Sequence, residues 1–369
     1  MRNGSIRLSG SMVAALLVSA WLPLWAAGRY VPTIPPGYTS KVVLHVDYGT
    51  TPEKIRLFLG DEEGSDPAAV RQMRIAGDRF YFVDDVADTI KQFRSPGILV
   101  WETKRLRNVH FFDVAPDGSI YAVWGGSVDQ LSLINGQGKV VWTKTFRGVE
   151  EKLNKLGIRP AVDNFSTLDF TPLGTVIEIS HFGGTEGSGK TLSVLFDRNG
   201  EPVKVLPGDV VGKDGVVYDF SKIDVSRMHI PVVGTDTKGR RVKEVRLDLG
   251  PNKEVHLAGN ARFWRIVPDP TGGFVGLAYA KLPRRVPVLP VVRGMNRGLD
   301  TGQERVLWRF DQQGKLKEEW RFPMSRFEHT AVTSEVVVGS DGCVYHLTFG
   351  ETGIDVIRYS KGAKGDAQK

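Results

Sequence analysis

Residues 108–146, NVHFFDVAPDGSIYAVWGGSVDQLSLINGQGKVVWTKTF, decide the fold of this chain. Turn-forming residues divide the stretch, with Pro116-Asp117-Gly118 after the first apolar run and Asn135-Gly136-Gln137-Gly138 after the third. Alternation of apolar and polar residues over four to six positions, bounded by such turns, predicts strands joined as hairpins. The four strands expected here are residues 111–115, 120–124, 130–134 and 140–144.

Two kinds of turn recur along the chain at a spacing that matches this unit. A turn that ends in glycine occurs between strands at residues 94–97, 135–138, 197–200, 236–239, 311–314 and 359–362. A second turn opens a Tyr- or Val-rich strand at residues 77–78, 117–118, 172–174, 214–215, 272–273 and 341–342. Glycine supplies the positive φ that such turns need, and Asp or Asn at the start accepts hydrogen bonds from the turn backbone.

Repeats of roughly 40 residues with four strands each are the signature of a β-propeller. The two turn series therefore predict an all-β fold, a six-bladed β-propeller of four-stranded antiparallel blades. The last repeat has no outer strand of its own, since only AKGDAQK follows Gly362. We expect an N-terminal strand, residues 41–46 or 54–59, to complete that blade and close the ring.

Two repeats resemble blades of the NHL-repeat propellers, in the exported bacterial form. One is residues 60–102, GDEEGSDPAAVRQMRIAGDRFYFVDDVADTIKQFRSPGILVWE, and the other is residues 108–146. The resemblance covers most of residues 61–362 and lies in the cadence of strands and turns. It implies the fold, and the family includes scaffolds, receptors and a few enzymes. The fourth repeat, which is irregular, and the fifth, which has a long insertion, depart from the pattern.

The N-terminus has the pattern of a secretory signal peptide. Arg2 and Arg7 precede an apolar run at residues 12–25, and small residues follow, which predicts cleavage after Gly28. A retained signal anchor is the alternative. The lone Cys343 permits no intramolecular disulfide, which suits a bacterial periplasm. The domains expected are a signal peptide at 1–28, a Pro-rich tether at 29–40, a single propeller at 41–362 and a disordered tail at 363–369.

Composition narrows the classes of partner. The hydrophobic fraction of 41% and the charged fraction of 25% are those of a folded globular protein. The net charge of +7 is spread along the chain and forms no concentrated basic footprint, so nucleic acid is not an expected partner. After signal cleavage we expect a monomer with no membrane span, in the periplasm or secreted.

Residues 184–191, GTEGSGKT, match the phosphate-binding G-x-x-x-x-G-K-T pattern. That motif requires a helix that begins at the lysine, so that the helix N-terminus faces the phosphates. Residues 191–196 alternate as a strand instead. We therefore expect a hairpin tip here, without ATP binding.

One face of the ring is expected to collect the longer loops. Residues 282–304, LPRRVPVLPVVRGMNRGLDTGQE, are the most distinctive of these loops, and long loops without structure of their own are often functional. Its arginines suit carboxylate or phosphate groups of a partner, although a decorative loop is the alternative. They are Arg284, Arg285, Arg293 and Arg297. Residues 149–156 have helical spacing and are expected to form a short cap over the ring.

The hypothesis for function is a non-catalytic binding or interaction module that uses this loop-rich face. An unknown protein or small molecule is the expected partner, with no cofactor and no catalytic residue assigned. The alternative is a metal-dependent hydrolase or lyase with a divalent metal at the mouth of the central channel. Its candidate ligands are His110, Asn164, Asn260 and His329, and His181 is a further candidate binding residue. No G-x-S-x-G, H-E-x-x-H or C-x-x-C motif occurs.

Overall fold

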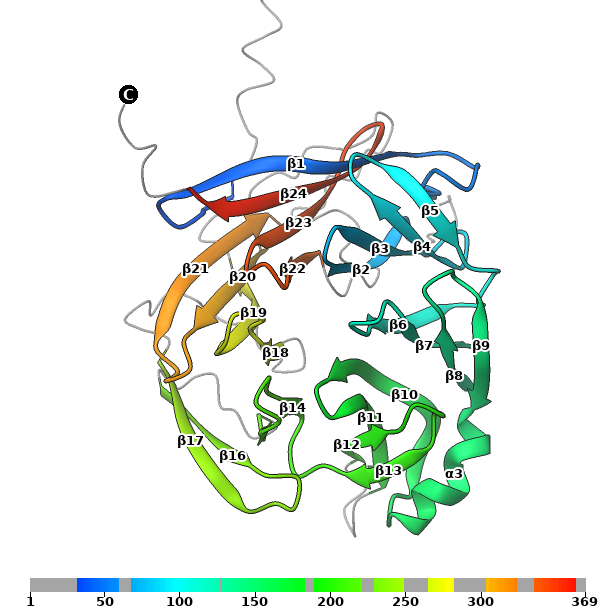
Figure 1. Cartoon of the computed structure of the whole chain (residues 1–369), viewed down its shortest axis with the longest axis vertical. Coiled ribbons are helices and arrows are strands. Elements are labelled where there is room, and N and C mark those ends of the chain that lie inside the picture. The colour runs from blue at the N-terminus through cyan, green and yellow to red at the C-terminus, as the bar shows by residue number, and fades with distance from the viewer. Residues whose placement is uncertain are drawn as a thin grey trace, which may run out of the picture.

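The protein is a ring of six four-stranded antiparallel sheets (Figure 1). The computed structural model describes residues 32–59, 68–126, 128–182, 189–220, 229–248, 265–281, 303–323 and 335–362. Each sheet is one blade, and successive blades follow one another around the ring. The predicted six-bladed β-propeller is confirmed.

The first three blades contain consecutive strands of the chain, given from the inner to the outer strand. Blade 1 is β2 (Val70–Ala76), β3 (Arg79–Asp84), β4 (Thr89–Arg94) and β5 (Ile98–Glu102). Blade 2 is β6 (Val109–Val114), β7 (Ile120–Gly125), β8 (Asp129–Ile134) and β9 (Val140–Thr145). Blade 3 is β10 (Pro160–Thr171), β11 (Gly174–Phe182), β12 (Gly189–Phe196) and β13 (Pro202–Val205).

The remaining blades complete the ring. Blade 4 is β14 (Val210–Val211), β15 (Val217–Tyr218), β16 (His229–Thr235) and β17 (Arg241–Asp248), and its two inner strands are short, as its irregular sequence suggests. Blade 5 is β18 (Arg265–Pro268), β19 (Phe274–Lys281), β20 (Gln303–Phe310) and β21 (Leu316–Pro323). Blade 6 is β22 (Val336–Val338), β23 (Val344–Phe349), β24 (Gly353–Lys361) and the N-terminal strand β1 (Tyr38–Asp47).

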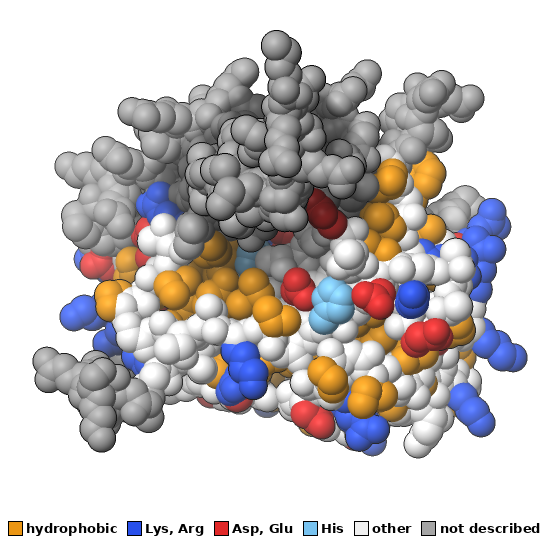
Figure 2. Space-filling model, turned by 90° about the horizontal axis from the view of Figure 1, so that it is seen from above, with side chains coloured by type: hydrophobic (Ala, Val, Ile, Leu, Met, Phe, Trp, Pro, Cys, Tyr) orange, Lys and Arg blue, Asp and Glu red, His pale blue; other side chains and the backbone are white. Residues whose placement is uncertain are grey.

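Strand β1 closes the ring, as the truncated last repeat predicts. It pairs antiparallel with β24, with Ser40 opposite Tyr359 and Leu44 opposite Val356. The strand begins at Tyr38, within the stretch expected as a tether. Figure 2 shows this edge of the ring, where hydrophobic, acidic and basic side chains are interspersed. On β1, His45 lies between two acidic groups, with Nδ1 2.7 Å from an oxygen of Asp355 and Nε2 3.1 Å from an oxygen of Asp47.

The prediction of a second candidate strand at residues 54–59 is wrong. These residues form only isolated bridges, between Tyr48 and Ile55 and between Phe58 and Ala68. The reason is that β24 has one free edge, which β1 occupies along its length. Residues 54–59 are instead part of the connection from the outer strand of blade 6 to the inner strand of blade 1.

The hydrophobic core is divided among the interfaces between neighbouring blades. Apolar side chains on facing sheets form six buried clusters, one at each junction of the ring. At the junction of blades 6 and 1, Leu44 of β1 packs in the same cluster as Phe82 of β3 and Leu347 of β23. Each blade is therefore stabilised by both neighbours, and burial of one such side chain contributes about 1.5–3 kcal/mol.

The glycine turns between the third and fourth strands join adjacent blades. Gly138 and Gly200 have φ of 77° and 71°, which glycine adopts without strain. A Cβ on Gly200 would lie 2.4 Å from the ring of Trp142, on the outer strand of the preceding blade. The side chain of Asp197 caps the same turn by accepting hydrogen bonds from Asn199 and Glu201. These turns therefore serve both the hairpin and the contact with the neighbouring blade.

The sixth expected glycine turn, residues 359–362, is not a turn between strands. Strand β24 continues through it to Lys361. Blade 6 receives its outer strand from the N-terminus, so no hairpin is needed at this point. The amide of Gly362 donates to the carbonyl of Gly37 at 2.8 Å, which joins the two ends of the blade.

The helix expected around residues 149–156 forms as α3 (Phe146–Lys155). The hydroxyl of Thr145 caps its N-terminus by accepting a hydrogen bond from the amide of Gly148. Its apolar face buries Phe146, Val149 and Leu153 in the core between blades 2 and 3. The helix lies at the rim of the ring beside β9 and β13 (Figure 1), so its expected position as a cap over the ring is wrong.

The phosphate-loop pattern does not have the helix that it requires. Lys190 lies in β12, which pairs residue by residue with β11. The strand expected at residues 191–196 is confirmed. Of the described helices, none has the length and apolar character needed to cross a membrane.

Candidate functional site

The blades define two faces of the ring. The first and third turns of each blade lie on one face, here called the turn face. The second turns and the connections between blades lie on the other, the loop face. Inner strands run from the loop face to the turn face, so residues at their starts gather around the ring axis on the loop face.

A polar cluster occupies this position between blades 1 and 2. We call it the loop-face cluster, and it comprises Arg71, Asp85, Asn108, His110 and Asp129. Arg71 Nη2 lies 2.8 Å from Asp85 Oδ1, and Nη1 donates to Asn108 Oδ1 at 3.0 Å. The same nitrogen donates to the carbonyl of Val109 at 3.2 Å. The guanidinium therefore has a fixed orientation between the two blades.

His110 is the sequence-predicted residue that belongs to this cluster. Its Nε2 lies 3.4 Å from Asp129 Oδ1 and 3.5 Å from Asn108 Nδ2. The other oxygen of Asp129 accepts a hydrogen bond of 2.7 Å from the amide of Phe165 in blade 3. Asp129 is 4% exposed and His110 is 28% exposed, so the carboxylate supports an imidazole that solvent can reach.

The backbone of this region adopts an uncommon conformation. Asp88 and Asn108 have φ of 56° and 55°, and they are the non-glycine residues with positive φ among those described. Asp and Asn tolerate this region better than other residues. The amide of Asn108 donates to Asp88 Oδ1 at 3.0 Å, which fixes the two positions to each other. Such conformations concentrate at sites where the surrounding structure holds residues for function.

The acids of the loop face differ in their electrostatic surroundings. Burial raises the pKa of Asp85 above its ordinary value, and the neighbouring Arg71 opposes this rise. Deeper along the inner strands, burial also raises the pKa of Asp113. Arg74 donates to Asp113 Oδ1 at 3.1 Å, and the amide of Phe170 donates to Oδ2 at 2.7 Å. Asp113 therefore connects three blades.

The other predicted site residues are not brought into this cluster. His181 lies on β11, and its Nδ1 accepts a hydrogen bond of 2.9 Å from the amide of Arg159. Asn164 lies on β10, where its backbone is described. The remaining predicted residues lie outside the described part of the chain: Asn260, Arg284, Arg285, Arg293, Arg297 and His329. Within the described ranges, no three or more His, Cys, Asp or Glu side chains are grouped so that they could hold a metal ion.

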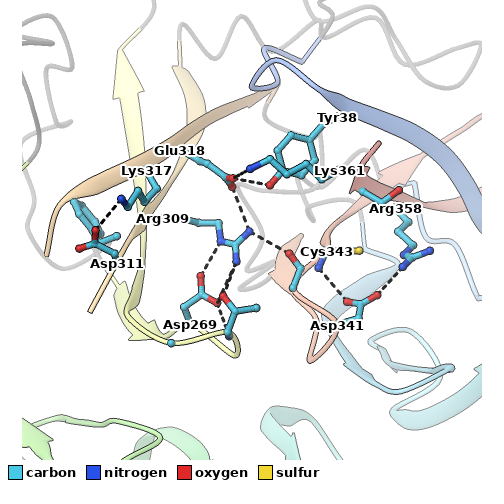
Figure 3. Close-up of a pocket in the computed structure, with 15 residues that line it drawn as sticks. Tyr38, Asp269, Arg309, Asp311, Lys317, Glu318, Asp341, Cys343, Arg358 and Lys361 are labelled. Carbon is cyan, nitrogen blue, oxygen red and sulfur yellow. Dashed lines mark hydrogen bonds and ion pairs between the residues drawn. The ribbon is translucent and has the colours of Figure 1, made fainter. Parts of the chain in front are cut away.

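A cavity of about 560 Å³ lies between blades 5 and 6 on the turn face (Figure 3). Sequence reasoning missed it, because its residues come from the turns and outer strands of two blades. We call it the inter-blade cavity. Its charged lining consists of Asp269, Arg309, Asp311, Lys317, Glu318, Asp341, Arg358 and Lys361.

Arg309 organises the floor of the inter-blade cavity. Its Nε donates to Asp269 Oδ2 at 2.7 Å, and its Nη1 donates to Glu318 Oε2 at 3.2 Å. Nη1 also donates to the carbonyl of Gly342 at 3.1 Å, which joins blade 5 to blade 6. Nη2 donates to Asp269 Oδ1 and to Thr271 Oγ1, so all five N–H groups have acceptors.

The opposite wall of the cavity is polar as well. Asp341 accepts hydrogen bonds from Arg358 Nη2 and Tyr345 Oη, each at 2.9 Å. Hydrogen bonds from the amide of Cys343 and from these side chains hold the pKa of Asp341 below its ordinary value despite the opposing effect of burial. Burial raises the pKa of the Cys343 thiol, so the thiol is protonated and is a poor nucleophile.

Comparisons with known proteins identify no family. No family model matches the chain, and no curated protein matches it. The resemblance to NHL repeats therefore stays a prediction, while the six-bladed architecture follows from the sheets themselves.

Several solved structures are similar to this chain at low sequence identity. A putative exported protein from Bacteroides fragilis is 8% identical, with 89% of this chain and 96% of that chain covered and a TM-score of 0.45. A luciferin-regenerating enzyme is 13% identical, with 80% and 92% covered and a TM-score of 0.44. A gluconolactonase from Xanthomonas campestris is 10% identical, with 87% and 99% covered and a TM-score of 0.42. Enzymes and an exported protein thus occur side by side, and none of these similarities transfers an activity.

Proposed function

We propose that this protein is an exported, monomeric β-propeller that binds a partner or ligand without catalysis, through its loop face. The observation that carries the proposal is the fixed guanidinium of Arg71, held between Asp85 and Asn108 where two inner strands begin. Rigid polar groups of this kind suit recognition, because little side-chain entropy is lost when a ligand binds.

The contacts that the acids of the loop-face cluster already make favour a binding role over a catalytic one. Asp85 is in contact with Arg71, and Asp129 accepts the amide of Phe165. A general base needs a free lone pair directed at the substrate proton. Oδ1 of Asp85 contacts Arg71, and both oxygens of Asp129 contact neighbouring groups, so we assign these acids the role of supports for Arg71 and His110.

We further propose that loops of the same face, beyond the described residues, contact the partner. Arg284, Arg285, Arg293 and Arg297 supply a density of guanidinium groups that suits carboxylates or phosphates. Asn260 and His329 belong to the same proposed surface, with His181 as a further contact. ATP and nucleic acid are not proposed as partners.

A metal-dependent hydrolase or lyase is the second candidate. The observation that favours it is His110, which solvent can reach and which lies beside the buried Asp129, because a carboxylate behind a histidine is a frequent arrangement around metal ligands. Asn164, Asn260 and His329 would supply the other ligands, with Ca²⁺ or Zn²⁺ as the metal.

Site-specific photo-crosslinking tests the choice of face. Gly126 on the loop face is exposed, and a Cβ there meets nothing within 4 Å, so it can accept a photoreactive side chain. Gln137, which is exposed on the turn face, is the matched control. In the native host we expect a crosslinked product at position 126 and none at position 137. A product only at position 137 contradicts the proposal, and no product at either position rejects a protein partner.

Metal analysis separates the binding module from the enzyme. We expect purified protein to contain less than one equivalent of Ca²⁺ or Zn²⁺ and to hydrolyse no ester or lactone faster than its His110→Ala variant. One bound metal per chain, together with turnover that His110→Ala abolishes, would establish the enzyme instead.

The proposed export can be tested by the position of the mature N-terminus. The proposed signal peptide predicts that the mature chain recovered from the periplasm or medium begins at Arg29. N-terminal sequencing of the exported protein checks this, and a chain that begins at Met1 and sediments with membranes indicates a retained anchor.

A further inference from the structure

We infer that the inter-blade cavity is a binding site for a neutral, hydroxyl-rich ligand such as a mono- or disaccharide. The site lies on the turn face, away from the loop-face cluster, and its argument is independent of the proposed function. It rests on three observations of the described residues: the balance of charge, the hydrogen-bonding capacity that remains, and the size of the cavity.

The charges that line the cavity cancel. Four basic side chains face four acidic ones, and contacts of 2.7–3.4 Å join them into pairs. Asp269 and Glu318 are 2% and 13% exposed, whereas Lys317 and Lys361 at the rim are 55% and 69% exposed. The basic group at the depth of these two acids is Arg309, which is 11% exposed and whose N–H groups all have acceptors. An anion would meet the carboxylates below the rim, and a cation would have to displace a lysine. A neutral ligand avoids both costs.

The side chains that line the cavity keep both hydrogen-bond acceptors and hydrogen-bond donors that the described contacts do not use. A carboxylate has about four acceptor sites, and the described contacts use three on Glu318: Tyr38 Oη, Lys361 Nζ and Arg309 Nη1. Asp311 likewise accepts from the amides of Gln313 and Lys315 and from Lys317 Nζ.

Each ammonium group has about three donors. The described contacts use one on Lys317 and one on Lys361. All the N–H groups of Arg309 already donate to protein acceptors, so Arg309 orders the cavity residues and has no donor left for a ligand. A hydroxyl group both donates and accepts, so a polyol can bond to the acids and the lysines together without breaking their pairs (Figure 3).

The size and rigidity of the cavity agree with such a ligand. A volume of about 560 Å³ falls within the range of about 300–1,000 Å³ of small-molecule sites. Tyr38 borders the cavity, donates to Glu318 Oε1 at 2.6 Å, and has Lys361 Nζ at 5.5 Å from its ring centroid. Burial and the neighbouring Glu318 raise the pKa of Tyr38, so the hydroxyl remains a donor.

A panel of small ligands of different charge tests the inference by isothermal titration calorimetry. Glucose and maltose are the neutral probes, gluconate is the anion, glucosamine the cation and glycine the zwitterion. For the full mature chain we expect a neutral sugar to bind at least tenfold more tightly than any charged probe. Tighter binding of gluconate, glucosamine or glycine overturns the inference, and so does failure of both sugars to bind at about 50 mM, where a site with a Kd of about 1 mM would be almost fully occupied.

A pair of variants locates the binding. Lys317→Ala combined with Lys361→Ala removes the lysine donors at the rim and leaves the Arg309 frame in place. We expect a loss of about tenfold or more in sugar affinity, because two hydrogen bonds are lost. Lys315→Ala is the control, since Lys315 is exposed two residues away and does not line the cavity. Equal affinity of the double variant and the wild type, with both folded by circular dichroism, overturns the inference.

Discussion

At the scale of single residues, polar side chains in this propeller mainly hold backbone from the next element. Gln72 both donates to the carbonyl of Phe112 and accepts from its amide, across the junction of blades 1 and 2. Asp209 similarly accepts the amide of Phe220 at 2.6 Å. Of these two groups only Asp209 ionises, and because burial disfavours its charged form, its ionisation affects the stability of the whole protein.

Asp209 provides a pH-dependent prediction. Burial raises its pKa to about 6, above the ordinary value of 3.8. Its stabilising contribution is therefore complete below pH 4 and is lost as the pH rises through 6. Asp209→Asn keeps the acceptor and removes the charge, so we expect it to be more stable than wild type by about 2 kcal/mol at pH 7.5. Urea unfolding at pH 4 and 7.5 measures this.

The comparison with Asp78→Asn controls for a general effect of charge, since Asp78 is exposed on a turn. For Asp78→Asn, the difference in unfolding free energy from wild type should be the same at pH 4 and at pH 7.5. If Asp209→Asn is no more stable than wild type at pH 7.5, the carboxyl is already well accommodated as an anion.

At the scale of elements, the hairpins follow from local sequence. The four strands expected at residues 111–144 lie within two residues of β6, β7, β8 and β9. Alternation and turn chemistry are properties of neighbouring residues, so the sequence alone reveals them. The contact of Trp142 with Gly200 is different, because it joins positions that only the ring brings together.

Substitution of two glycines distinguishes these effects. Gly200→Ala introduces a methyl group against Trp142 as well as strain at positive φ, so we expect a loss of about 2–4 kcal/mol. Gly118→Ala has the same kind of φ, 81°, with no atom within 4 Å of the added carbon. We expect that variant to lose about 1 kcal/mol. Equal losses in urea unfolding would mean that the inter-blade contact contributes nothing.

The elements that were predicted wrongly share a physical cause. Residues 54–59 and 359–362 have suitable local patterns, but β1 from the N-terminal end of the chain occupies the free edge of β24, so neither segment pairs as predicted. The position of α3 likewise depends on the gap between blades 2 and 3. The sequence pointed to His110 but not to Arg71, Asp85 or the inter-blade cavity, because these sites combine turns and strand ends from different blades.

At the scale of the whole molecule, the ring is closed within blade 6, where the N-terminal strand β1 pairs with β24 from the other end of the chain. Leu44 of β1 is 1% exposed in the core shared by blades 6 and 1. In addition, the amide of His45 donates to the carbonyl of Pro96 in blade 1 at 3.0 Å. Strand β1 therefore holds both neighbours.

A charge at this junction should affect the entire ring. For Leu44→Asp we expect a loss of about 4 kcal/mol or more, with faster hydrogen exchange in blades 6 and 1 than elsewhere. Val42→Asp, on the same strand but 52% exposed, should change stability by less than about 0.5 kcal/mol. Similar losses in the two variants would show that β1 is dispensable for closure.

The pairing of β1 with β24 also constrains how the protein comes into being. His45 and Asp355, which meet across this pair, are 310 positions apart. During synthesis, β1 must wait, with one edge uncovered, until nearly all of the polypeptide has followed. Exposed strand edges invite association with other chains. A nascent chain halted before its final strand is therefore the species that we expect a chaperone or a protease to recognise.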